Sequence, residues 1–337
     1  MSHRFVSILL ITLSFTVAAY PPTVNITGDG WKSYCEGNCT SPRKRNGKTY
    51  GGSIYMGGGL DVTASFLQQI TWSGGGDFVI LRADDDNGYN DWIYTTLGGV
   101  NSVTSLIVFN KSGTGNDTVL NILNNADAIF LGGGDQWQYV SVWGGTMVQM
   151  ALRSARGIIP VGGTSAGCMV LSHEVFNAEN GGCTSAEALA NPYSKYINIG
   201  PGFINMTNIP YNVIFDTHFV TRNRFGRLLT WVARYLQDGG FQQFYGVGYD
   251  EQSSLVTSSD GQLASLVGFG SAFVIYGDVA PTVCAPGMPL SIAPLSVQKL
   301  EPGDTFDFTK MEGGRPENRY KVGAVNGKLT THNPYSP

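Results

Sequence analysis

The sequence is poor in charged residues and in histidine. Only 14% of its 337 residues are charged, with 21 basic side chains against 25 acidic ones and a net charge of −4. It contains no run of five or six like charges, so the composition argues against a nucleic-acid partner. There are only four histidines, which leaves few places for chemistry that needs an imidazole.

The apolar segment at the N-terminus is too short to span a membrane. It covers residues 5–17, whereas a spanning helix needs ~20 apolar residues. A basic residue, Arg4, precedes it and the small residues Ala18 and Ala19 follow it. This pattern predicts a secretory signal peptide over residues 1–19. We therefore expect no stable membrane insertion, and a location outside the cell or in a lysosome-like lumen.

Cysteine is scarce and odd in number, because the chain has five. In an oxidising compartment an odd count leaves at least one thiol unpaired, and Cys168, in an apolar stretch, is the expected one. Cys35 and Cys39 are close enough in sequence to form a small loop, which leaves Cys183 and Cys284 as a long-range disulfide. Five sequons predict a glycoprotein: Asn25, Asn38, Asn110, Asn116 and Asn205.

Glycine, in contrast, is abundant, with 45 residues. Between residues 49 and 256, short apolar runs alternate with segments long enough for a helix. The runs are residues 53–56, 78–81, 105–109, 128–131, 158–161 and 213–215. Such runs are typical of buried parallel strands joined by crossover helices, so we expect an α/β fold. After residue 260 the pattern predicts short strands and turns without clear helices.

Several runs end in glycine or in polar side chains suited to a site. These ends are residues 57–59, 84–86, 132–135, 162–165 and 216–218. Ligands bind outside the carboxyl ends of strands in open parallel sheets, so these loops are expected to gather at one edge. The stretch DDDNG over 84–88 lacks the spacing of a calcium loop. We expect no metal and no cofactor.

Residues 163–167 read GTSAG and fit the G-x-S-x-G pattern between an apolar run and further apolar residues. Small neighbours let a serine oxygen stand clear of the backbone, and the N-terminus of a following helix offers N–H groups to an oxyanion. The pattern predicts Ser165 as a nucleophile. The alternative is a tight structural turn.

A nucleophilic serine needs a base, and the four histidines can be compared directly. His3 lies in the signal peptide. His173 lies about 12 Å along the helix that is expected to begin at Ser165, too far for a hydrogen bond. His332 lies in a polar tail, whereas His218 ends an apolar run as Ser165 does. We therefore expect His218 to be the base.

The acid that orients this histidine is left open by the residues alone. Asp216 lies two positions before His218, while Asp250 and Glu251 follow another apolar run. Alternation along an extended segment sends Asp250 and Glu251 to opposite sides, so only one of them can face the histidine.

Three arginines follow His218 closely, at positions 222, 224 and 227. A guanidinium matches a carboxylate in bidentate geometry, so these side chains suit a substrate with a free acid group. The alternative is a solvated helix face.

Five ordered blocks of the chain resemble the cyanophycinase family of serine peptidases, which is related to the aspartyl dipeptidases. The blocks are GGSIYMGGGLDV, FLGGGDQWQYV, PVGGTSAGCMV, DTHFVTRNRFGRL and GVGYDEQSSLV, within residues 50–277. The resemblance implies a flavodoxin-like three-layer sandwich with a mainly parallel sheet, related to class I glutamine amidotransferases. It places an N-terminal extension at 20–48, a catalytic domain at 49–277, and a strand- and loop-rich C-terminal extension at 278–337, packed on the same domain.

The resemblance also implies roles for individual residues. Ser165, His218 and Glu251 form a Ser-His-Glu triad that uses no metal. The substrate-pocket positions fall on Gln136, Asp216, Arg222, Arg224 and Arg227. The oxyanion hole is formed by backbone N–H groups at Ala166, Gly133 and Gly134. The implied substrate is a peptide or isopeptide bond at an aspartyl residue, as in the β-Asp-Arg unit, and a second copy of the chain is a candidate partner.

Two positions depart from the family pattern. Thr217 stands where cyanophycinases usually have glutamine, which removes an amide that could contact the substrate. Cys168 stands where they usually have a second alanine.

Two other functions are compatible with the residues. The first is an α/β-hydrolase esterase, whose chain order of serine, acid and histidine would use Ser165, Asp304 and His332. The second is a secreted binding protein that kept the fold and lost turnover.

Overall fold

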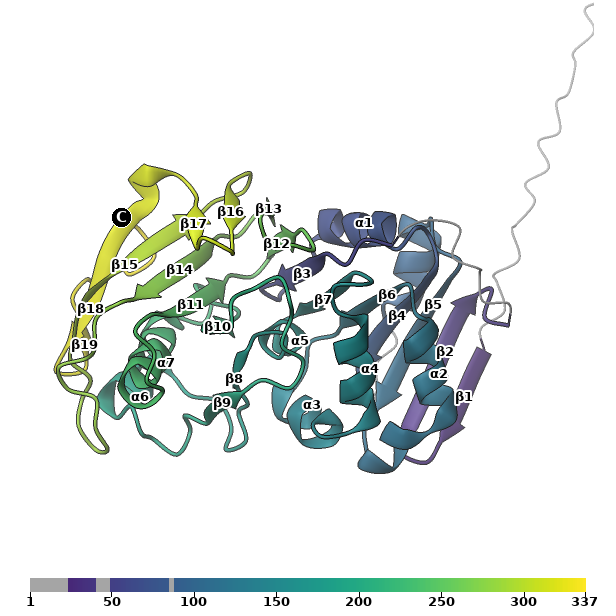
Figure 1. Ribbon diagram of the computed structural model, residues 1–337, viewed down its shortest axis with the longest axis horizontal. Coiled ribbons are helices and arrows are strands. Elements are labelled where there is room, and N and C mark those ends of the chain that lie inside the picture. Colours follow the sequence, from purple (N-terminus) through teal and green to yellow (C-terminus); the bar gives the residue numbers. More distant parts are fainter. Residues whose placement is uncertain (1–23, 41–48, 85–87) are drawn as a thin grey trace, which may run out of the picture.

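The computed structural model describes residues 24–40, 49–84 and 88–337, and its strands form two sheets that lie side by side (Figure 1). The predicted signal peptide lies outside these residues. The first sheet has eleven strands and the second has eight. Among the helices in the described part of the chain, none is both long enough and apolar enough to cross a bilayer.

Five parallel strands form the middle of the first sheet, in the order β5-β4-β6-β7-β3. Their bounds are β3 (Ser53–Met56), β4 (Asp77–Arg82), β5 (Ser102–Val108), β6 (Ala128–Leu131) and β7 (Val161–Thr164). These strands confirm the predicted apolar runs, although β7 begins at Val161 and leaves Ile158 exposed. The runs are continuous because both faces are covered: Ile80 packs on one face and Leu81 on the other.

Antiparallel strands extend this sheet at both sides. They are β1 (Val24–Gly28), β2 (Trp31–Gly37), β12 (Ser253–Thr257), β13 (Ala264–Gly268), β16 (Thr305–Asp307) and β17 (Glu312–Gly313). The described part of the N-terminal extension expected at 20–48 is thus a hairpin, in which β2 pairs with β5 and continues the sheet.

The second sheet is mostly antiparallel. Its strands are β8 (Glu174–Phe176), β9 (Ile199–Pro201), β10 (Val213–Asp216), β11 (Phe244–Tyr249), β14 (Ala272–Gly277), β15 (Ile292–Leu300), β18 (Arg319–Val325) and β19 (Lys328–Leu329). Only β10 runs parallel to its neighbours β8 and β11. The expectation of a mainly parallel sheet is therefore wrong. The fold is mixed α/β, because the strands after β11 are added through antiparallel pairings.

Helices cover both faces of the first sheet (Figure 1). The helices are α1 (Thr63–Trp72), α2 (Asp117–Asn125), α3 (Gln136–Trp143), α4 (Met147–Ala155), α5 (Ala166–Met169), α6 (Ser185–Ala190) and α7 (Phe225–Asp238). Helix α1 packs on one face, α2 to α4 pack on the other, and α7 packs on the second sheet. The side chain of Asn116 caps α2 by accepting from the amides of Thr118 and Val119.

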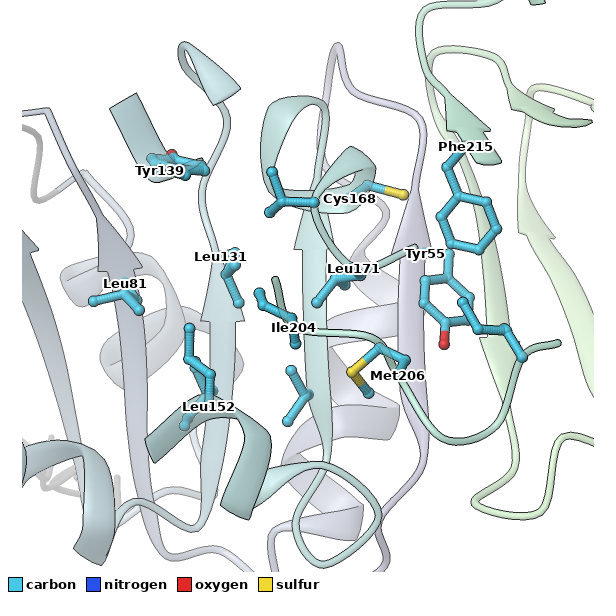
Figure 2. Packing of buried hydrophobic residues seen from close by; sticks show 14 of the residues in the cluster. Tyr55, Leu81, Leu131, Tyr139, Leu152, Cys168, Leu171, Ile204, Met206 and Phe215 are labelled. Atoms are coloured by element: carbon cyan, nitrogen blue, oxygen red, sulfur yellow. The ribbon is translucent and has the colours of Figure 1, made fainter. Parts of the chain in front are cut away.

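An aromatic cluster joins the two sheets beneath the carboxyl ends of their parallel strands. The ring of Tyr55, from β3, lies 5.0 Å from that of Phe215, from β10, and Phe215 lies 5.2 Å from Tyr249, at the end of β11. Figure 2 shows Tyr55 and Phe215 facing each other across the junction, with Cys168 close by. Edge-to-face pairs of this kind add about 0.5–1.5 kcal/mol beyond burial, so the strand ends that carry the site are held together by packing.

The cysteines follow the sequence-based expectation only in part. Cys35 and Cys39 form a disulfide, and Cys168 is a buried free thiol, as expected. The expected bridge between Cys183 and Cys284 is wrong, because both are free and buried. Cys183 lies beside the first turns of α7, where its carbonyl accepts from Nη1 of Arg227 at 3.2 Å, whereas Cys284 lies close to the charges of Arg234 and Asp238, nearer the end of that helix.

Candidate active site

Ser165 occupies a strained turn between β7 and α5. Its φ of 52° and ψ of −122° lie outside the regions that a non-glycine residue normally adopts. Strain of this kind persists only where the surroundings enforce it, and it presents the side chain away from the backbone. The helix that follows ends at Met169, so the expectation of one helix from Ser165 to His173 is wrong.

The two glycines of the GTSAG motif are required by close approach. A β-carbon at Gly163 would lie 2.5 Å from the carbonyl carbon of Gly167, and one at Gly167 would lie 2.2 Å from the carbonyl oxygen of Leu131. Neither side chain would fit. The motif therefore packs the turn of Ser165 tightly against the end of β6.

Ser165, His218 and Glu251 form a chain of two short hydrogen bonds. The Oγ of Ser165 lies 2.7 Å from Nε2 of His218, and Nδ1 of His218 lies 2.6 Å from Oε1 of Glu251. The imidazole is buried, while the side chain of Glu251 is 25% exposed. The three residues follow three different strands, β7, β10 and β11, so the two sheets both contribute to the site.

The other candidate acids have different partners. Asp250 accepts from the amides of Val220 and Thr221, both at 3.0 Å, and thereby holds the loop after His218. Asp216 is fully buried and pairs with Arg227. Of the three candidate acids, Asp216, Asp250 and Glu251, only Glu251 contacts the imidazole of His218.

The other two described histidines lie away from Ser165. His173 is bonded through Nε2 to the carbonyl of Met206, at 2.9 Å. His332 is exposed in the C-terminal tail, and Asp304 pairs with Arg315 at 3.0 Å. The serine, acid and histidine arrangement required by the esterase alternative is not present among these residues.

A glycine loop after β3 holds the three segments in register, a role that sequence reasoning missed. Successive backbone carbonyls of Met56, Gly57 and Gly58 accept from the amides of Ser165 (3.1 Å), His218 (2.8 Å) and Gln252 (2.9 Å) respectively. One short stretch of backbone therefore connects the nucleophile turn, the histidine loop and the turn that carries Glu251. The only signal in the sequence was a glycine run at a strand end.

The same loop must be glycine because it lies against the side chains it positions. A β-carbon at Gly58 would lie 2.5 Å from Cε1 of His218, and one at Gly59 would lie 2.9 Å from Cβ of Glu251. Both glycines also have positive φ, at 98° and 74°.

The backbone amides expected to form an oxyanion hole lie around Ser165. Ala166 is the first residue of α5, where an N–H has no intrahelical acceptor. Gly133 approaches Ser165 from β6, since a β-carbon there would lie 3.4 Å from Cβ of Ser165. Gly134 lines the same pocket as Ser165 and Ala166.

A pocket of about 280 Å³ opens beside Ser165. Among the predicted substrate-pocket residues, four line it: Gln136, Arg222, Arg224 and Arg227. Gln136 donates to the carbonyl of Phe176 at 3.2 Å. The fifth, Asp216, lies behind the pocket rather than in it, because it is fully buried and its carboxylate binds Arg227 through both oxygens, with an Nε–Oδ2 distance of 2.7 Å.

Arginines make the pocket electropositive, and two of them affect the pKa of His218. Burial lowers the pKa of His218 below its usual value; the hydrogen bond to Glu251 opposes this shift, and the charges of Arg222 and Arg224 add to it. The imidazole is therefore neutral at pH 7. Burial also lowers the pKa of Arg224, to about 10, so its guanidinium keeps its charge at that pH.

No group of three or more histidine, cysteine or acidic side chains within the described ranges is arranged to hold a metal ion. The site consists of a serine, an imidazole and a carboxylate in series, with backbone amides on one side and guanidinium groups on the other. Such an arrangement suits acyl transfer through a covalent serine intermediate.

Comparison with known proteins finds relatives of this chain. The sequence profile of peptidase family S51 matches residues 82–191. The chain is 30% identical over 266 residues to a cyanophycinase from Synechococcus elongatus, covering 74% of this chain and 75% of that protein. A cyanophycinase from Geminocystis herdmanii is 28% identical over 186 residues, covering 53% and 62%. A solved peptidase from an acI-B1 Actinobacterium has 19% identity and a TM-score of 0.48, and the match covers 78% and 98% of the two chains.

Proposed function

The chain belongs to the cyanophycinase family of serine peptidases, peptidase family S51, and on this premise we propose that it hydrolyses peptide or isopeptide bonds at aspartyl residues. The observation that carries the proposal is the hydrogen-bonded series of Ser165, His218 and Glu251 beside a pocket lined by arginine. A binding protein without turnover would have no use for this series.

The proposed reaction proceeds in two halves. The Oγ of Ser165 attacks the carbonyl carbon of the scissile bond while its proton passes to Nε2 of His218. The carbon–nitrogen bond then breaks, and His218 returns the proton to the leaving amine. A water molecule attacks the acyl-enzyme, its proton goes to His218, and Ser165 regains a proton as the acid product departs. Glu251 accepts a hydrogen bond from the Nδ1–H of His218 and stabilises the imidazolium in both halves.

The arginines of the pocket favour a substrate whose acyl group carries a carboxylate. Arg227 is paired with Asp216, whose Oδ1 also lies 3.5 Å from Nη1 of Arg224; Nη1 of Arg224 donates to the carbonyl of Thr217 at 2.8 Å, and its other nitrogens keep further N–H donors. Arg222 is exposed and pairs with no carboxylate among the described residues. The guanidinium of Arg222 and the remaining N–H donors of Arg224 suit the carboxylate that an aspartyl residue presents, whether the cleaved bond is α or β. The β-Asp-Arg unit named for cyanophycinases, or a related dipeptide unit, is the proposed substrate.

The flavodoxin-like relationship of the fold belongs to the same proposal. Strands β4 to β7 follow the spatial order β5-β4-β6-β7, which matches the first four places of the flavodoxin-like order 2-1-3-4-5. The fifth place is taken by β3, from the beginning of the domain. The serine then lies at the carboxyl end of a parallel strand, where this fold class binds ligands.

We also propose that the protein is secreted or delivered to a lysosome-like lumen and is glycosylated. The disulfide between Cys35 and Cys39 supports an oxidising compartment. Among the sequons, Asn25, Asn38 and Asn110 are exposed.

A panel of α- and β-aspartyl dipeptides, each paired with its asparaginyl isostere, tests the activity. The aspartyl compounds should be hydrolysed at least about 100-fold faster, because the neutral amide leaves Arg222 without a charged partner and offers Arg224 a weaker acceptor. The Ser165→Ala variant should lose turnover by about 10⁴-fold or more while unfolding at the wild-type temperature. Hydrolysis retained in this variant, or equal rates for the two sets of compounds, would contradict the proposal.

A further inference from the structure

The glycine turn after β6 carries two peptide groups whose carbonyls are bonded away from Ser165. The hydroxyl of Tyr139 lies 2.9 Å from the carbonyl oxygen of Gly132 and 2.9 Å from that of Gly133. The Nη2 of Arg82 lies 3.3 Å from the carbonyl oxygen of Gly133. A phenol has one hydrogen to donate, so the guanidinium is a second donor for the two acceptors.

Peptide planarity converts these carbonyl contacts into amide directions. In a trans peptide the N–H of a residue points opposite to the C=O of the residue before it. When Tyr139 and Arg82 hold the carbonyls of Gly132 and Gly133, the amides of Gly133 and Gly134 must point to the other side. Gly133 itself lies beside Ser165, because a β-carbon at Gly133 would lie 3.4 Å from Cβ of Ser165, whereas the two carbonyls face Tyr139.

The turn has little resistance of its own to rotation. Both residues of the Gly133–Gly134 peptide lack a β-carbon, and Gly134 has a φ of 141°, which only glycine adopts readily. A rotation of this peptide would turn the carbonyl of Gly133 toward Ser165 and put an acceptor where the oxyanion needs donors. Contacts outside the turn must therefore set its orientation.

We propose that Tyr139 and Arg82 are positioning residues that keep the Gly133–Gly134 peptide in the orientation required by the oxyanion hole. The inference rests on the proposed function of Ser165. Both side chains are buried and are themselves fixed. The ring of Tyr139 stacks on Trp143 with centroids 4.4 Å apart, and Arg82 pairs with Asp84 through Nε at 2.8 Å. Tyr139, from α3, and Arg82, at the end of β4, thus fix the orientation of the glycine turn beside Ser165.

Phosphonylation by a fluorophosphonate probe measures this effect without a peptide substrate. The Oγ of Ser165 forms a bond to phosphorus, fluoride leaves, and the serine proton passes to His218, while negative charge develops on the phosphoryl oxygen. In the Tyr139→Phe variant, the maximal labelling rate should fall by about 10- to 100-fold. This loss is smaller than the about 10²–10³-fold cost of removing an oxyanion donor, because the amide is still present and only its orientation is less well held. The probe's apparent dissociation constant should stay within about twofold, since the ground-state phosphoryl oxygen carries less charge.

Three further variants separate positioning from general damage. Tyr235→Phe is the matched control, because Tyr235 also stacks on an aromatic ring, at 4.2 Å from Phe244, and donates one hydrogen bond, to Glu174 at 2.7 Å. It should label at the wild-type rate. Arg82→Lys should also slow labelling, and the double variant with Tyr139→Phe should be less impaired than the product of the two effects, because both act on one peptide.

The outcomes decide between the alternatives. Labelling of Tyr139→Phe within twofold of the wild-type rate, or a loss equal to that of Tyr235→Phe, would overturn the positioning role. A loss confined to the dissociation constant would overturn it as well. If the wild-type protein labels at Ser165 but cleaves no aspartyl peptide, the substrate assignment fails while this test stands.

Discussion

The charge state of His218 is set by burial and by neighbouring arginines. The imidazole lies in the interior against Ser165 and Glu251, and both Arg222 and Arg224 add to the lowering of its pKa. A base must be neutral to accept the serine proton. The lowered pKa therefore extends the active pH range toward acid, which suits an enzyme proposed for a secretory or lysosome-like compartment.

Replacing Arg222 with glutamine should move the acidic limb of the rate to higher pH. Loss of a positive neighbour makes the imidazolium easier to form, so the pKa of His218 rises and protonation removes the base at a higher pH. The measurement is the fluorophosphonate labelling rate as a function of pH. Arg319→Gln, on β18 beside Tyr276, is the control and should leave the profile unchanged. A limb that stays in place, or moves to lower pH, would contradict this account of the charge.

Single residues also show how far sequence reasoning reaches. Ser165 and His218 could be selected because a motif and a short list of histidines restricted the choice. Glu251 could not be selected from the residues alone, because the argument assumed an extended segment. The chain instead turns after β11, and Gln252 has a φ of 57°. Turn geometry decides which side chain faces the imidazole, and only the resemblance to a family indicated Glu251.

Among the elements, the C-terminal tail holds the histidine loop. The hydroxyl of Tyr335 accepts from the amide of Phe225 at 3.1 Å and lies 3.2 Å from the carbonyl oxygen of Phe219. Its ring also packs against that of Phe219, with centroids 5.7 Å apart. Phe219 is the residue after His218, which itself has a φ of 50° and so needs support from outside the loop.

Replacing Tyr335 with alanine should therefore slow the chemistry as well as destabilise the protein. We expect a loss of about 1–3 kcal/mol in the free energy of unfolding, from the buried part of the ring and its hydrogen bonds, and a fall of about tenfold in the labelling rate of Ser165. Chemical unfolding and labelling below the transition measure the two effects. Tyr335→Phe keeps the ring and should lose about 1 kcal/mol or less. Full labelling rate in Tyr335→Ala would show that the tail does not position the loop.

Helices and strands could be predicted where a short stretch of sequence carries the pattern that defines them. The parallel strands appeared as apolar runs because both of their faces are buried, and residues 128–131 match β6 at both ends. Helix α5 was expected to be longer, since apolar residues continue after Met169, but these residues fill the core as irregular chain and not as helix. The positioning contact between Tyr139 and the glycine turn had no sequence signal, because it depends on a distance through space.

At the scale of the whole molecule, the site lies where the chain crosses between the two sheets. The turn that carries Glu251 connects β11 of the second sheet to β12 of the first, and Ser165 lies on the connection from β7 to β8. The second sheet could not be foreseen, since the chain leaves it and returns: β12 and β13 lie between β11 and β14 in the sequence but pair in the first sheet. Its assembly nevertheless decides whether the histidine and the carboxylate reach the serine.

The C-terminal segment, residues 278–337, contributes strands to both sheets. Strand β15 pairs with β14, and β16 pairs with β13. Five large aliphatic side chains of the segment are buried in the core of the second sheet: Leu290, Ile292, Leu295, Val297 and Val322. At about 1.5–3 kcal/mol each, they contribute roughly 7–15 kcal/mol, as much as the whole stability of a typical domain, about 5–15 kcal/mol.

A chain that ends at Gly277 should therefore fail to fold. Removing the segment exposes this core and leaves β13 and β14 as open edges, which promote aggregation. The expected result is insoluble protein, or soluble protein without a cooperative unfolding transition and without labelling of Ser165. A chain that ends at Leu329 is the control: it keeps β15, β18 and β19, so it should unfold cooperatively and label slowly, like Tyr335→Ala. Wild-type unfolding of the shorter chain would mean that residues 49–277 are an independent domain, and that the second sheet needs only β8 to β14 to bring His218 and Glu251 to the serine.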